Sequence, residues 1–445
     1  MFLFLVKAFN VLRWSLMRVF VKSFGCSTNL ADGEVLAGCL VEAGHLLVDS
    51  VSEADVAVFN TCAVKGPTEN RMIEILKRVP VGKKLIAVGC LPLINFERLC
   101  KEVRFDGVAG PAIGDKIVEV MEQVSKGEKV VALKEAVSTK PSLTLPRVRL
   151  NPTISIVPVN YGCLGSCAYC CVIFARGHLR SYGVKEIVHR VKRDLAFGAR
   201  EFWVTSQDTA CYGRDQGTNL PELLTALSSI KGDFRVRVGM MTPNMLTDIL
   251  ENLIQVFRSE RIFKFVHLPV QSGDDQVLKH MRRFYSVDDF KNIVNAFRRS
   301  FPRITLATDV ICGFPSESEE AFEKTRRLIE DVEPDIVNVS KFFARPKTAA
   351  AKMQKDVVPP LEIKRRSTAL ADSARKIAFE RNRRWIGWTG EILIDEVGKI
   401  SGSWVGRNFA YKPIVIKETR DLIGETLSVK VARTFSTHLE GEVVE

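Results

Sequence analysis

Short apolar runs alternate with amphipathic helical patterns along the first part of the chain. Such alternation is typical of a parallel sheet with helices on both faces. The predicted strands are residues 18–24, 54–59, 84–88 and 103–109. The predicted helices are residues 29–44, 67–79, 93–100 and 113–124. We therefore expect an α/β domain over residues 18–137.

A second series of strand and helix patterns follows. The predicted strands are residues 154–159, 201–205, 234–238, 263–268, 304–310 and 335–339. Six such β/α units predict a partial (β/α)6 barrel over residues 153–384, with its chemistry at the carboxyl ends of the strands. Residues 138–152 contain three prolines and no helical period, which predicts a linker between the two domains.

The last part of the chain combines a basic helix with short strands. Residues 359–384 read as one helix that carries few acidic residues. Its arginines are Arg365, Arg366, Arg375, Arg381, Arg383 and Arg384. Strand patterns then recur at residues 390–397, 411–416, 425–433 and 440–444. Glycine punctuation between these short strands predicts a small β-barrel over residues 385–445.

Residues 1–17 form an apolar N-terminal extension. Its longest uninterrupted apolar run is residues 1–6, far short of the roughly 20 residues of a membrane span. No small-residue cleavage site follows, so the pattern does not fit a secretory signal. We expect these residues to be dispensable, with Met17 as a possible translation start, and we expect a cytoplasmic protein.

The net charge of +12 favours a polyanionic partner, of which RNA or DNA is the commonest. Surface solubility explains such a charge equally well. The chain also contains 11 cysteines, an odd number, without a regular disulfide framework. That usage is typical of a reducing compartment, where cysteine serves metal binding, catalysis or core packing.

Three cysteines lie close together directly after the first predicted barrel strand. Cys163, Cys167 and Cys170 have the spacing C-x3-C-x2-C. Three thiolates can hold three irons of a 4Fe–4S cluster and leave the fourth iron open. S-adenosylmethionine can bind that iron through its amino and carboxylate groups, and one electron can then cleave its sulfonium C–S bond. Zinc is the alternative, although it usually takes a fourth protein ligand.

Three further cysteines occupy matched positions in the first domain. Cys26, Cys62 and Cys90 each follow a predicted parallel strand. Because the carboxyl ends of such strands share one edge of a sheet, we expect these side chains to converge. Ordinary packing is the alternative for any buried cysteine, and it is our interpretation of Cys171 and Cys211.

These motifs resemble the radical S-adenosylmethionine methylthiotransferases (the MiaB/RimO-like enzymes), and most of all their archaeal and eukaryotic threonylcarbamoyladenosine tRNA branch. The resemblance extends from Arg18 to the C-terminus. Matching stretches are TSQDT at residues 205–209, HLPVQSG at 267–273, TDVICGFP at 308–315 and ARPKTA at 344–349. The predicted tail barrel resembles the TRAM domain, an RNA-binding module.

The resemblance implies two 4Fe–4S clusters, one on each cysteine triad. The cluster on Cys26, Cys62 and Cys90 would be auxiliary and would deliver sulfur. S-adenosylmethionine would supply both the methyl group and the adenosyl radical. Tyr169 matches the aromatic residue that lies against the adenosyl group. The site residues with expected contacts to cofactor or substrate are Tyr169, Gln207, Gln271 and Asp309.

The expected reaction places a methylthio group on C2 of N6-threonylcarbamoyladenosine, on the 3′ side of the tRNA anticodon. The expected partners are tRNA, bound by the basic helix and tail, and a ferredoxin- or flavodoxin-like electron donor. Other relatives modify isopentenyladenosine or an aspartate of a ribosomal protein, and an iron–sulfur protein that only binds RNA or transfers electrons is the non-enzymatic alternative. Ser316 and Lys347 depart from the family pattern, since glycine is usual at both positions.

Overall fold

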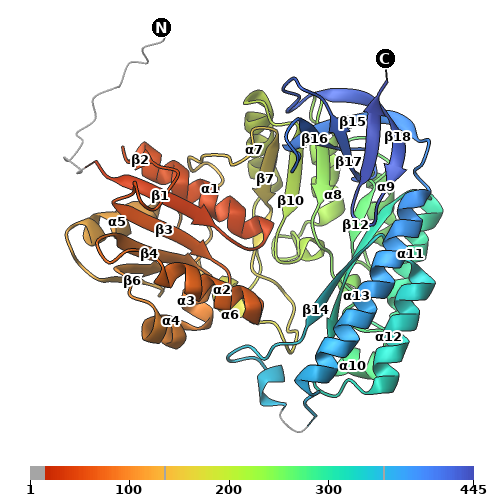
Figure 1. Ribbon diagram of the computed structural model, residues 1–445, viewed down its shortest axis with the longest axis horizontal. Coiled ribbons are helices and arrows are strands. Elements are labelled where there is room, and N and C mark those ends of the chain that lie inside the picture. The colour runs from red at the N-terminus through yellow and green to blue at the C-terminus, as the bar shows by residue number, and fades with distance from the viewer. Residues whose placement is uncertain (1–15, 135–136, 354–355, 445) are drawn as a thin grey trace. The chain divides into compact units, whose positions relative to one another are not determined.

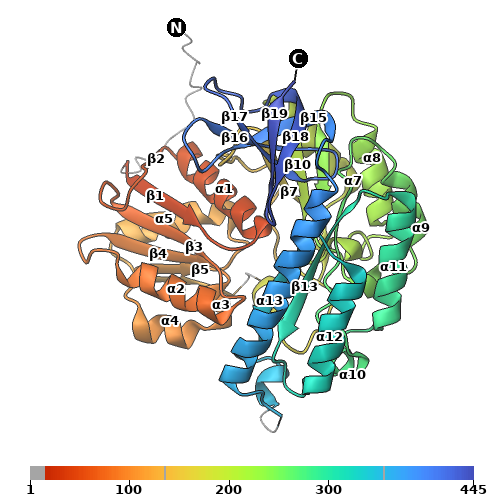
Figure 2. The ribbon, with the colours of Figure 1, turned by 45° about the vertical axis from the view of Figure 1, so that its right-hand side comes forward.

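The computed structural model describes residues 16–134, 137–353 and 356–444. The chain divides into two compact units, Met1–Val148 and Arg149–Glu445, which Figures 1 and 2 show from two directions. The predicted N-terminal extension lies almost entirely outside the described residues. Among the residues that are described, no helix is both long enough and apolar enough to cross a membrane.

The first unit is built on a parallel sheet with the strand order β2-β1-β3-β4-β5-β6. This confirms the predicted α/β domain. The strands are β1 Arg18–Ser23, β2 Leu46–Leu47, β3 Val56–Thr61, β4 Lys84–Gly89, β5 Gly107–Ala109 and β6 Val130–Ala132. The helices are α1 Ser27–Glu42, α2 Gly66–Lys77, α3 Leu91–Ile94, α4 Phe96–Glu102 and α5 Ile117–Ser125. Helices α1 and α5 cover one face of the sheet, and α2, α3 and α4 cover the other (Figure 1).

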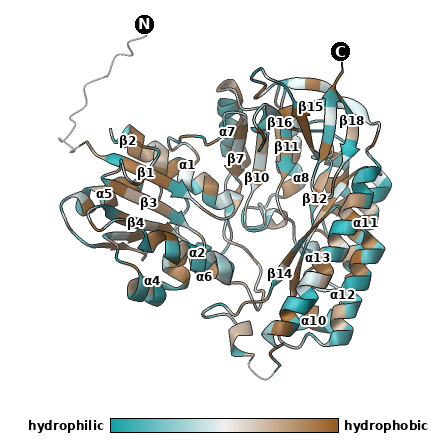
Figure 3. Ribbon diagram, in the orientation of Figure 1, coloured by the Kyte–Doolittle hydropathy of each residue, from teal (hydrophilic) through white to brown (hydrophobic). Residues whose placement is uncertain are grey.

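Hydrophobic side chains hold this sheet between its helices. All residues of β3 are buried, as expected for a central parallel strand covered on both faces. Leu36 and Leu40 of α1 pack with Val120 of α5 in the core. Figure 3 shows the same division, with mostly hydrophobic strands and hydrophilic outer helix surfaces.

Part of the proline-containing segment that the sequence predicts as a linker packs onto the first unit. A Cβ on Gly38 of α1 would lie 2.2 Å from the backbone of Arg147, so only glycine permits this close approach. The Arg147 guanidinium also pairs with the buried carboxylate of Glu34, at 3.5 Å. The boundary between the compact units consequently falls at Val148.

The second unit contains every strand of the predicted partial barrel. Two parallel groups, β11-β10-β7 and β12-β13-β14, are linked by a bridge between Val236 and Ile262. The strands are β7 Ile154–Pro158, β10 Glu201–Thr205, β11 Arg235–Val238, β12 Phe265–His267, β13 Thr305–Cys312 and β14 Ile336–Lys341. The helices are α6 Val172–Arg176, α7 Val184–Ala196, α8 Leu220–Ser228, α9 Leu250–Val256, α10 Asp275–His280, α11 Val287–Ser300, α12 Glu319–Val332 and α13 Pro360–Arg383. A small antiparallel pair, β8 Asn160–Tyr161 with β9 Arg180–Ser181, flanks the first strand.

The tail forms a closed barrel with the order β15-β16-β17-β19-β18. Its strands are β15 Thr389–Val397, β16 Ser403–Arg407, β17 Pro413–Lys417, β18 Thr426–Thr434 and β19 Leu439–Val443. The sequence pattern predicts this barrel but not β16. In β16, the sequence SWVGR contains a glycine and lacks a clear alternation of apolar and polar residues. Trp385 lies in the barrel core with Ile392 and Val429.

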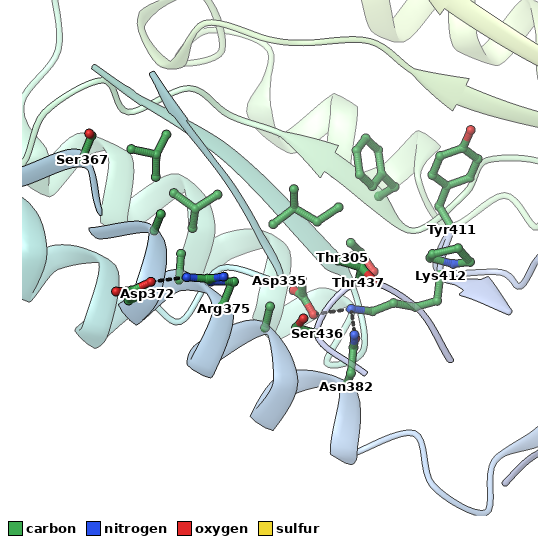
Figure 4. A pocket seen from close by; sticks show the side chains of 18 of the residues that line it. Thr305, Asp335, Ser367, Asp372, Arg375, Asn382, Tyr411, Lys412, Ser436 and Thr437 are labelled. Atoms are coloured by element: carbon green, nitrogen blue, oxygen red, sulfur yellow. Dashed lines mark hydrogen bonds and ion pairs between the residues drawn. The ribbon is translucent and has the colours of Figure 1, made fainter. Parts of the chain in front are cut away.

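A buried ion network ties the tail barrel and α13 to the partial barrel. Asp335 precedes β14, and its carboxylate accepts a hydrogen bond from Lys412 of the tail at 2.8 Å. Arg381 of α13 pairs with the same carboxylate at 3.3 Å. Lys412 also donates to the side-chain oxygen of Asn382, at 2.8 Å, as Figure 4 shows. Because all these groups are buried, the three elements hold one another in place.

Candidate metal centres

The loop that carries Cys163, Cys167 and Cys170 follows β7 and the short strand β8. Gly162 opens the loop with a positive φ of 74°, and a Cβ there would lie 1.9 Å from the carbonyl oxygen of His178. Only glycine fits this approach. The Gly162 amide donates to the side-chain oxygen of Gln207 at 2.8 Å. Gln207, which the sequence predicts as a cofactor contact, thus positions the start of the cysteine loop.

Two of the three thiols of this loop lie beside a second glycine. A Cβ on Gly165 would lie 3.3 Å from the Cys163 sulfur and 3.7 Å from the Cys167 sulfur. The Gly165 amide donates to the Cys163 sulfur at 3.1 Å. Cys163, Cys167 and Cys170 are all partly exposed. Three soft sulfur donors on one accessible loop fit an iron–sulfur cluster.

The electrostatic surroundings of the three thiols differ. A hydrogen bond from Cys211 lowers the pKa of the Cys163 thiol, against the opposing effect of burial. Burial raises the pKa of Cys170 to about 12, and the neighbouring Cys167 and Cys171 act in the same direction. A thiol whose pKa is raised in this way ionises readily at neutral pH only when a metal compensates its charge.

The rest of the loop is anchored by backbone hydrogen bonds. The Ala168 amide donates to the Met281 carbonyl at 2.9 Å, and the Ala350 amide donates to the Ala168 carbonyl at 2.8 Å. The Tyr169 ring packs edge-on against Phe314, with ring centroids 6.4 Å apart. Segments from three distant parts of the sequence therefore hold the loop rigid.

Two side chains that the sequence did not single out contact the cysteines directly. Arg283 donates through Nη1 to the Cys167 sulfur, at 3.2 Å. The sulfurs of Cys163 and Cys211 and a carboxylate oxygen of Asp208 lie within 4.8 Å of one another. Cys211, which we interpreted as a packing thiol, is therefore a neighbour of a predicted cluster ligand. Its position directly after the TSQDT stretch was the available signal.

The second triad lies at the carboxyl edge of the first unit's sheet. Strands β1, β3 and β4 are neighbours, with Ser23 opposite Asn60 and Thr61 opposite Gly89. Cys26, Cys62 and Cys90 follow the ends of these three strands. Three cysteines far apart in sequence thus follow neighbouring strands at one sheet edge.

Close backbone packing connects the segments that carry these cysteines. The Cys90 amide donates to the Thr61 carbonyl, next to Cys62, at 3.0 Å. Gly25 has a positive φ of 104°, and a Cβ there would lie 2.8 Å from the Cys62 sulfur. Cys62 and Cys90 are buried, whereas Cys26 is exposed. An edge with two buried thiols and one accessible thiol fits a cluster with one side open to a ligand.

Gln271 and Asp309 lie side by side in the partial barrel. The Gln271 amide donates to the Asp309 carbonyl at 2.8 Å. Gln271 has a positive φ of 69°, and its buried side-chain oxygen has no hydrogen-bond partner among the residues that the structure describes. The Asp309 carboxylate contacts the His267 ring nitrogen at 3.0 Å and accepts a hydrogen bond from Asn338 at 2.7 Å. Gln271 therefore offers an unused acceptor next to a fixed carboxylate.

The arginines of α13 occupy two different environments. Arg366 and Arg381 are buried, and they pair with Glu317 at 2.9 Å and with Asp335 at 3.3 Å. Their burial and these ion pairs favour a structural role for the two guanidiniums over the predicted contact with RNA. The exposed arginines also have acidic partners on the protein, and these exposed residues are Arg365, Arg375, Arg383 and Arg384.

Comparison with known proteins assigns a family to this arrangement. The Radical SAM superfamily matches residues 157–329, the family described as "Uncharacterized protein family UPF0004" matches residues 18–110, and the TRAM domain matches residues 383–444. A protein of Pyrococcus horikoshii named "Probable threonylcarbamoyladenosine tRNA methylthiotransferase" is 40% identical over 96% of this chain and 100% of its own length. The chain belongs to the family of the threonylcarbamoyladenosine tRNA methylthiotransferases. A human threonylcarbamoyladenosine tRNA methylthiotransferase is 34% identical over 96% of this chain and 74% of its own.

Solved structures agree on the fold of this family member. The radical S-adenosylmethionine methyltransferase TsrM from Kitasatospora setae superposes with a TM-score of 0.54 at 14% identity, covering 90% of this chain and 80% of TsrM. At that identity the similarity shows the fold alone. The radical SAM domain itself implies S-adenosylmethionine and a 4Fe–4S cluster as cofactors, which confirms that part of the sequence-based expectation.

Proposed function

We propose that this protein inserts a methylthio group at C2 of N6-threonylcarbamoyladenosine in tRNA, next to the anticodon. The observation that carries this proposal is the near full-length similarity to relatives with that name, together with a cysteine triad in each compact unit. The relatives named above share the threonylcarbamoyladenosine assignment, which favours this nucleoside over isopentenyladenosine and over a ribosomal protein. Paired triads favour an enzyme over a protein that only transfers electrons.

We assign the two triads to two clusters with different roles. Cys163, Cys167 and Cys170 would hold the radical SAM cluster, because their loop lies within the matched radical SAM region. Cys26, Cys62 and Cys90 would hold an auxiliary cluster in the unit that carries the UPF0004 match. When bound, the clusters supply the electron for cleavage of S-adenosylmethionine and the sulfur for transfer. A ferredoxin- or flavodoxin-like protein would provide the electron.

The protein's own side chains would orient the cofactor and the substrate. Tyr169 directly precedes Cys170 and offers an aromatic face beside the loop. The unpartnered side-chain oxygen of Gln271 can accept a hydrogen bond from an amino or hydroxyl group of S-adenosylmethionine. The Asp309 carboxylate, held by Asn338, can accept a second one. Gln207 would hold the start of the cysteine loop in position by accepting a hydrogen bond from the Gly162 amide.

A groove of about 840 Å3 in the second unit supports RNA binding at the α13 face. It runs between β14, α13 and the tail barrel, and Figure 4 shows its lining side chains. Lys341 and Arg375 contribute positive charge, and hydroxyl groups in the lining include those of Ser367, Thr368, Ser436 and Thr437. Cations and hydroxyls are the groups that contact phosphates and sugars. Of the arginines predicted to bind RNA, Arg375 is therefore the strongest candidate.

An aromatic pair lies next to this groove. The rings of Phe435 and His438 stack at 4.6 Å, and both residues retain solvent exposure. Asn382, a groove residue, donates to the Phe435 carbonyl at 2.7 Å. Base stacking on exposed rings is a common, sequence-tolerant contribution to binding of single-stranded RNA. We place the backbone of the anticodon arm along the groove.

The test is an anaerobic reaction with reconstituted protein, S-adenosylmethionine, a reductant and a sulfide source. With tRNA that carries N6-threonylcarbamoyladenosine, mass spectrometry of the nucleosides should detect the 2-methylthio derivative. The same tRNA without the threonylcarbamoyl group is the control and should not react. Product on the control tRNA, or on isopentenyladenosine alone, would contradict the proposed substrate.

Variants of the two triads test the division of roles. The reconstituted protein should hold about eight irons per chain if each triad carries a four-iron cluster. Replacing Cys167 by Ala should abolish formation of 5′-deoxyadenosine. Replacing Cys62 by Ala should spare it but stop sulfur insertion. Equal loss of 5′-deoxyadenosine in both variants, with both folded, would refute this assignment.

A further inference from the structure

Arg283 lies behind the cysteine loop with its charge directed at one thiol. Its Nη1 donates to the Cys167 sulfur at 3.2 Å, and the residue is 9% exposed. Two further contacts fix the guanidinium: Nε donates to the Tyr285 hydroxyl at 3.1 Å, and Nη2 donates to the Pro269 carbonyl at 3.3 Å. Within the described residues, no carboxylate forms an ion pair with Arg283. Its charge is therefore available to the thiolate.

Cys211 approaches the loop from a second direction. It is the last residue of the short 3-10 helix Thr209–Cys211 and is completely buried. Asp208 fixes this turn, because its carboxylate accepts a hydrogen bond from the Ala210 amide at 3.1 Å. The Cys211 sulfur lies within 4.8 Å of the Cys163 sulfur and 3.0 Å from the Asp208 carbonyl oxygen. The S–H donates to that Asp208 carbonyl oxygen in the structure, and rotation about the Cβ–Sγ bond redirects it to Cys163 once the Cys163 sulfur is a thiolate.

Hydrogen bonds to the ligating sulfurs are a known determinant of the potential of an iron–sulfur cluster. A donor or a positive charge beside a thiolate stabilises the reduced cluster, which carries one more negative charge. Charge-assisted hydrogen bonds such as that from Arg283 have the larger effect. A buried guanidinium keeps this effect at high ionic strength, since salt screens buried groups weakly.

We propose that Arg283 and Cys211 raise the reduction potential of the radical SAM cluster by hydrogen bonding to Cys167 and Cys163. Both act as positioning residues toward the ligands and do not ligate iron themselves. The inference rests on the proposed ligation by Cys163, Cys167 and Cys170. It predicts that the cluster accepts an electron from a weaker reductant than it would without these two side chains.

The experiment is a redox titration of the reconstituted protein followed by electron paramagnetic resonance. The radical SAM cluster is identified as the signal that changes when S-adenosylmethionine is added. Its midpoint potential should shift to more negative values in Arg283→Met, and by a smaller amount in Cys211→Ala. Cys211→Ser keeps a donor and should remain close to the unmodified protein. The signal that does not respond to S-adenosylmethionine should keep its potential in every variant.

Two substitutions serve as matched controls. Arg282→Met removes an exposed positive charge one residue away, and Cys312→Ala removes a buried thiol on β13. Neither should shift the potential. A second readout is the rate of 5′-deoxyadenosine formation with a weak and a strong reductant. Arg283→Met should lose most of its rate with the weak reductant and recover with the strong one.

An unchanged or more positive potential in Arg283→Met and Cys211→Ala, with full iron content, would overturn the inference. If Arg283→Met does not retain its cluster, Arg283→Lys and Tyr285→Phe decide instead. Each of these two variants weakens the contact between Nη1 and the Cys167 sulfur while the positive charge stays. Unchanged midpoint potentials in both variants would equally overturn the inference. Absence of iron, or of any response to S-adenosylmethionine, in the unmodified protein would refute the proposed function instead.

Discussion

Replacing Asp335 by Ala should strongly destabilise the second unit. The carboxylate is buried and receives Lys412 at 2.8 Å and Arg381 at 3.3 Å. Its removal leaves the buried Lys412 without an anion and leaves Arg381 with only the half-exposed Glu333, at 4.0 Å. Breaking a buried pair in this way typically costs about 3–5 kcal/mol. Because the three charged groups come from the partial barrel, α13 and the tail, we expect the whole unit to be weakened together.

The assay is urea unfolding followed by tryptophan fluorescence, since Trp385 lies in the core of the tail barrel. Asp331→Ala is the control, because its carboxylate is exposed and lies 3.7 Å from Lys291. An exposed pair of this kind contributes about 1 kcal/mol or less. A free energy of unfolding for Asp335→Ala within about 1 kcal/mol of the unmodified protein would refute the reasoning. So would a loss no larger than that of the control.

The pH dependence provides an independent check on the same carboxylate. Burial opposes ionisation of Asp335, but Lys412 and Arg381 outweigh it and lower the pKa. A lowered carboxyl pKa stabilises the fold above the unfolded value, about 3.9, and this stabilisation is lost as the pH falls further. The difference in stability between Asp335→Asn and the unmodified protein should therefore be full at neutral pH and shrink below about pH 4. A difference that stays constant down to pH 3 would contradict the assigned shift.

Three further changes have expected outcomes. Gly25→Ala should expel the auxiliary cluster, about four irons per chain, because its Cβ would lie 2.8 Å from the Cys62 sulfur; Gly44→Ala, also at positive φ but in open space, should keep all iron. Lys347→Gly should stabilise the protein by up to about 1 kcal/mol in thermal unfolding, because φ is 67° there, and a loss of stability would contradict this. Arg375→Glu should weaken tRNA binding and reduce the salt slope by about one, measured by filter binding. An unchanged affinity for tRNA would exclude the groove as the RNA-binding site.

Much of the fold followed from periodicity. The strands of the partial barrel coincide with apolar or alternating runs. Strands β7, β10, β12 and β13 are mostly buried, whereas β14 has no fully buried residue. The strands that were missed are short or atypical: β2, β8 and β9 have two residues each, β6 has three, and β16 contains Gly406. Such segments depend on their neighbours for strand geometry and have little pattern of their own.

Ser316 and Lys347, where the family usually has glycine, both adopt a left-handed backbone conformation. Glycine is usual at both positions, and the structure gives them φ values of 75° and 67°. The chain therefore keeps the left-handed conformation without glycine at these positions. Ser316 gains a hydrogen-bonding contact with the His280 ring at 2.7 Å, which offsets part of the strain.

The arginines of α13 show that a high number of positive charges on a helix does not by itself predict an exposed basic surface. Arg366 lies on the same helical stripe as Leu370, Ala374 and Ala378, which are all buried. That spacing of three to four residues was visible in the sequence and predicts an inward position. The number of positive charges on the helix does not distinguish buried from exposed arginines, whereas their positions around the helix axis do. Arg283 could not have been identified in this way, because its contact with Cys167 joins residues 116 positions apart.

The most direct test of the account is the nucleoside composition of tRNA in cells with and without this gene. The account predicts that 2-methylthio-N6-threonylcarbamoyladenosine is present with the gene and absent without it, while N6-threonylcarbamoyladenosine accumulates. Complementation with the intact gene should restore the product, and complementation with the Cys62→Ala or Cys167→Ala variant should not. Persistence of the 2-methylthio nucleoside in cells that lack the gene and any related gene would contradict the central claim.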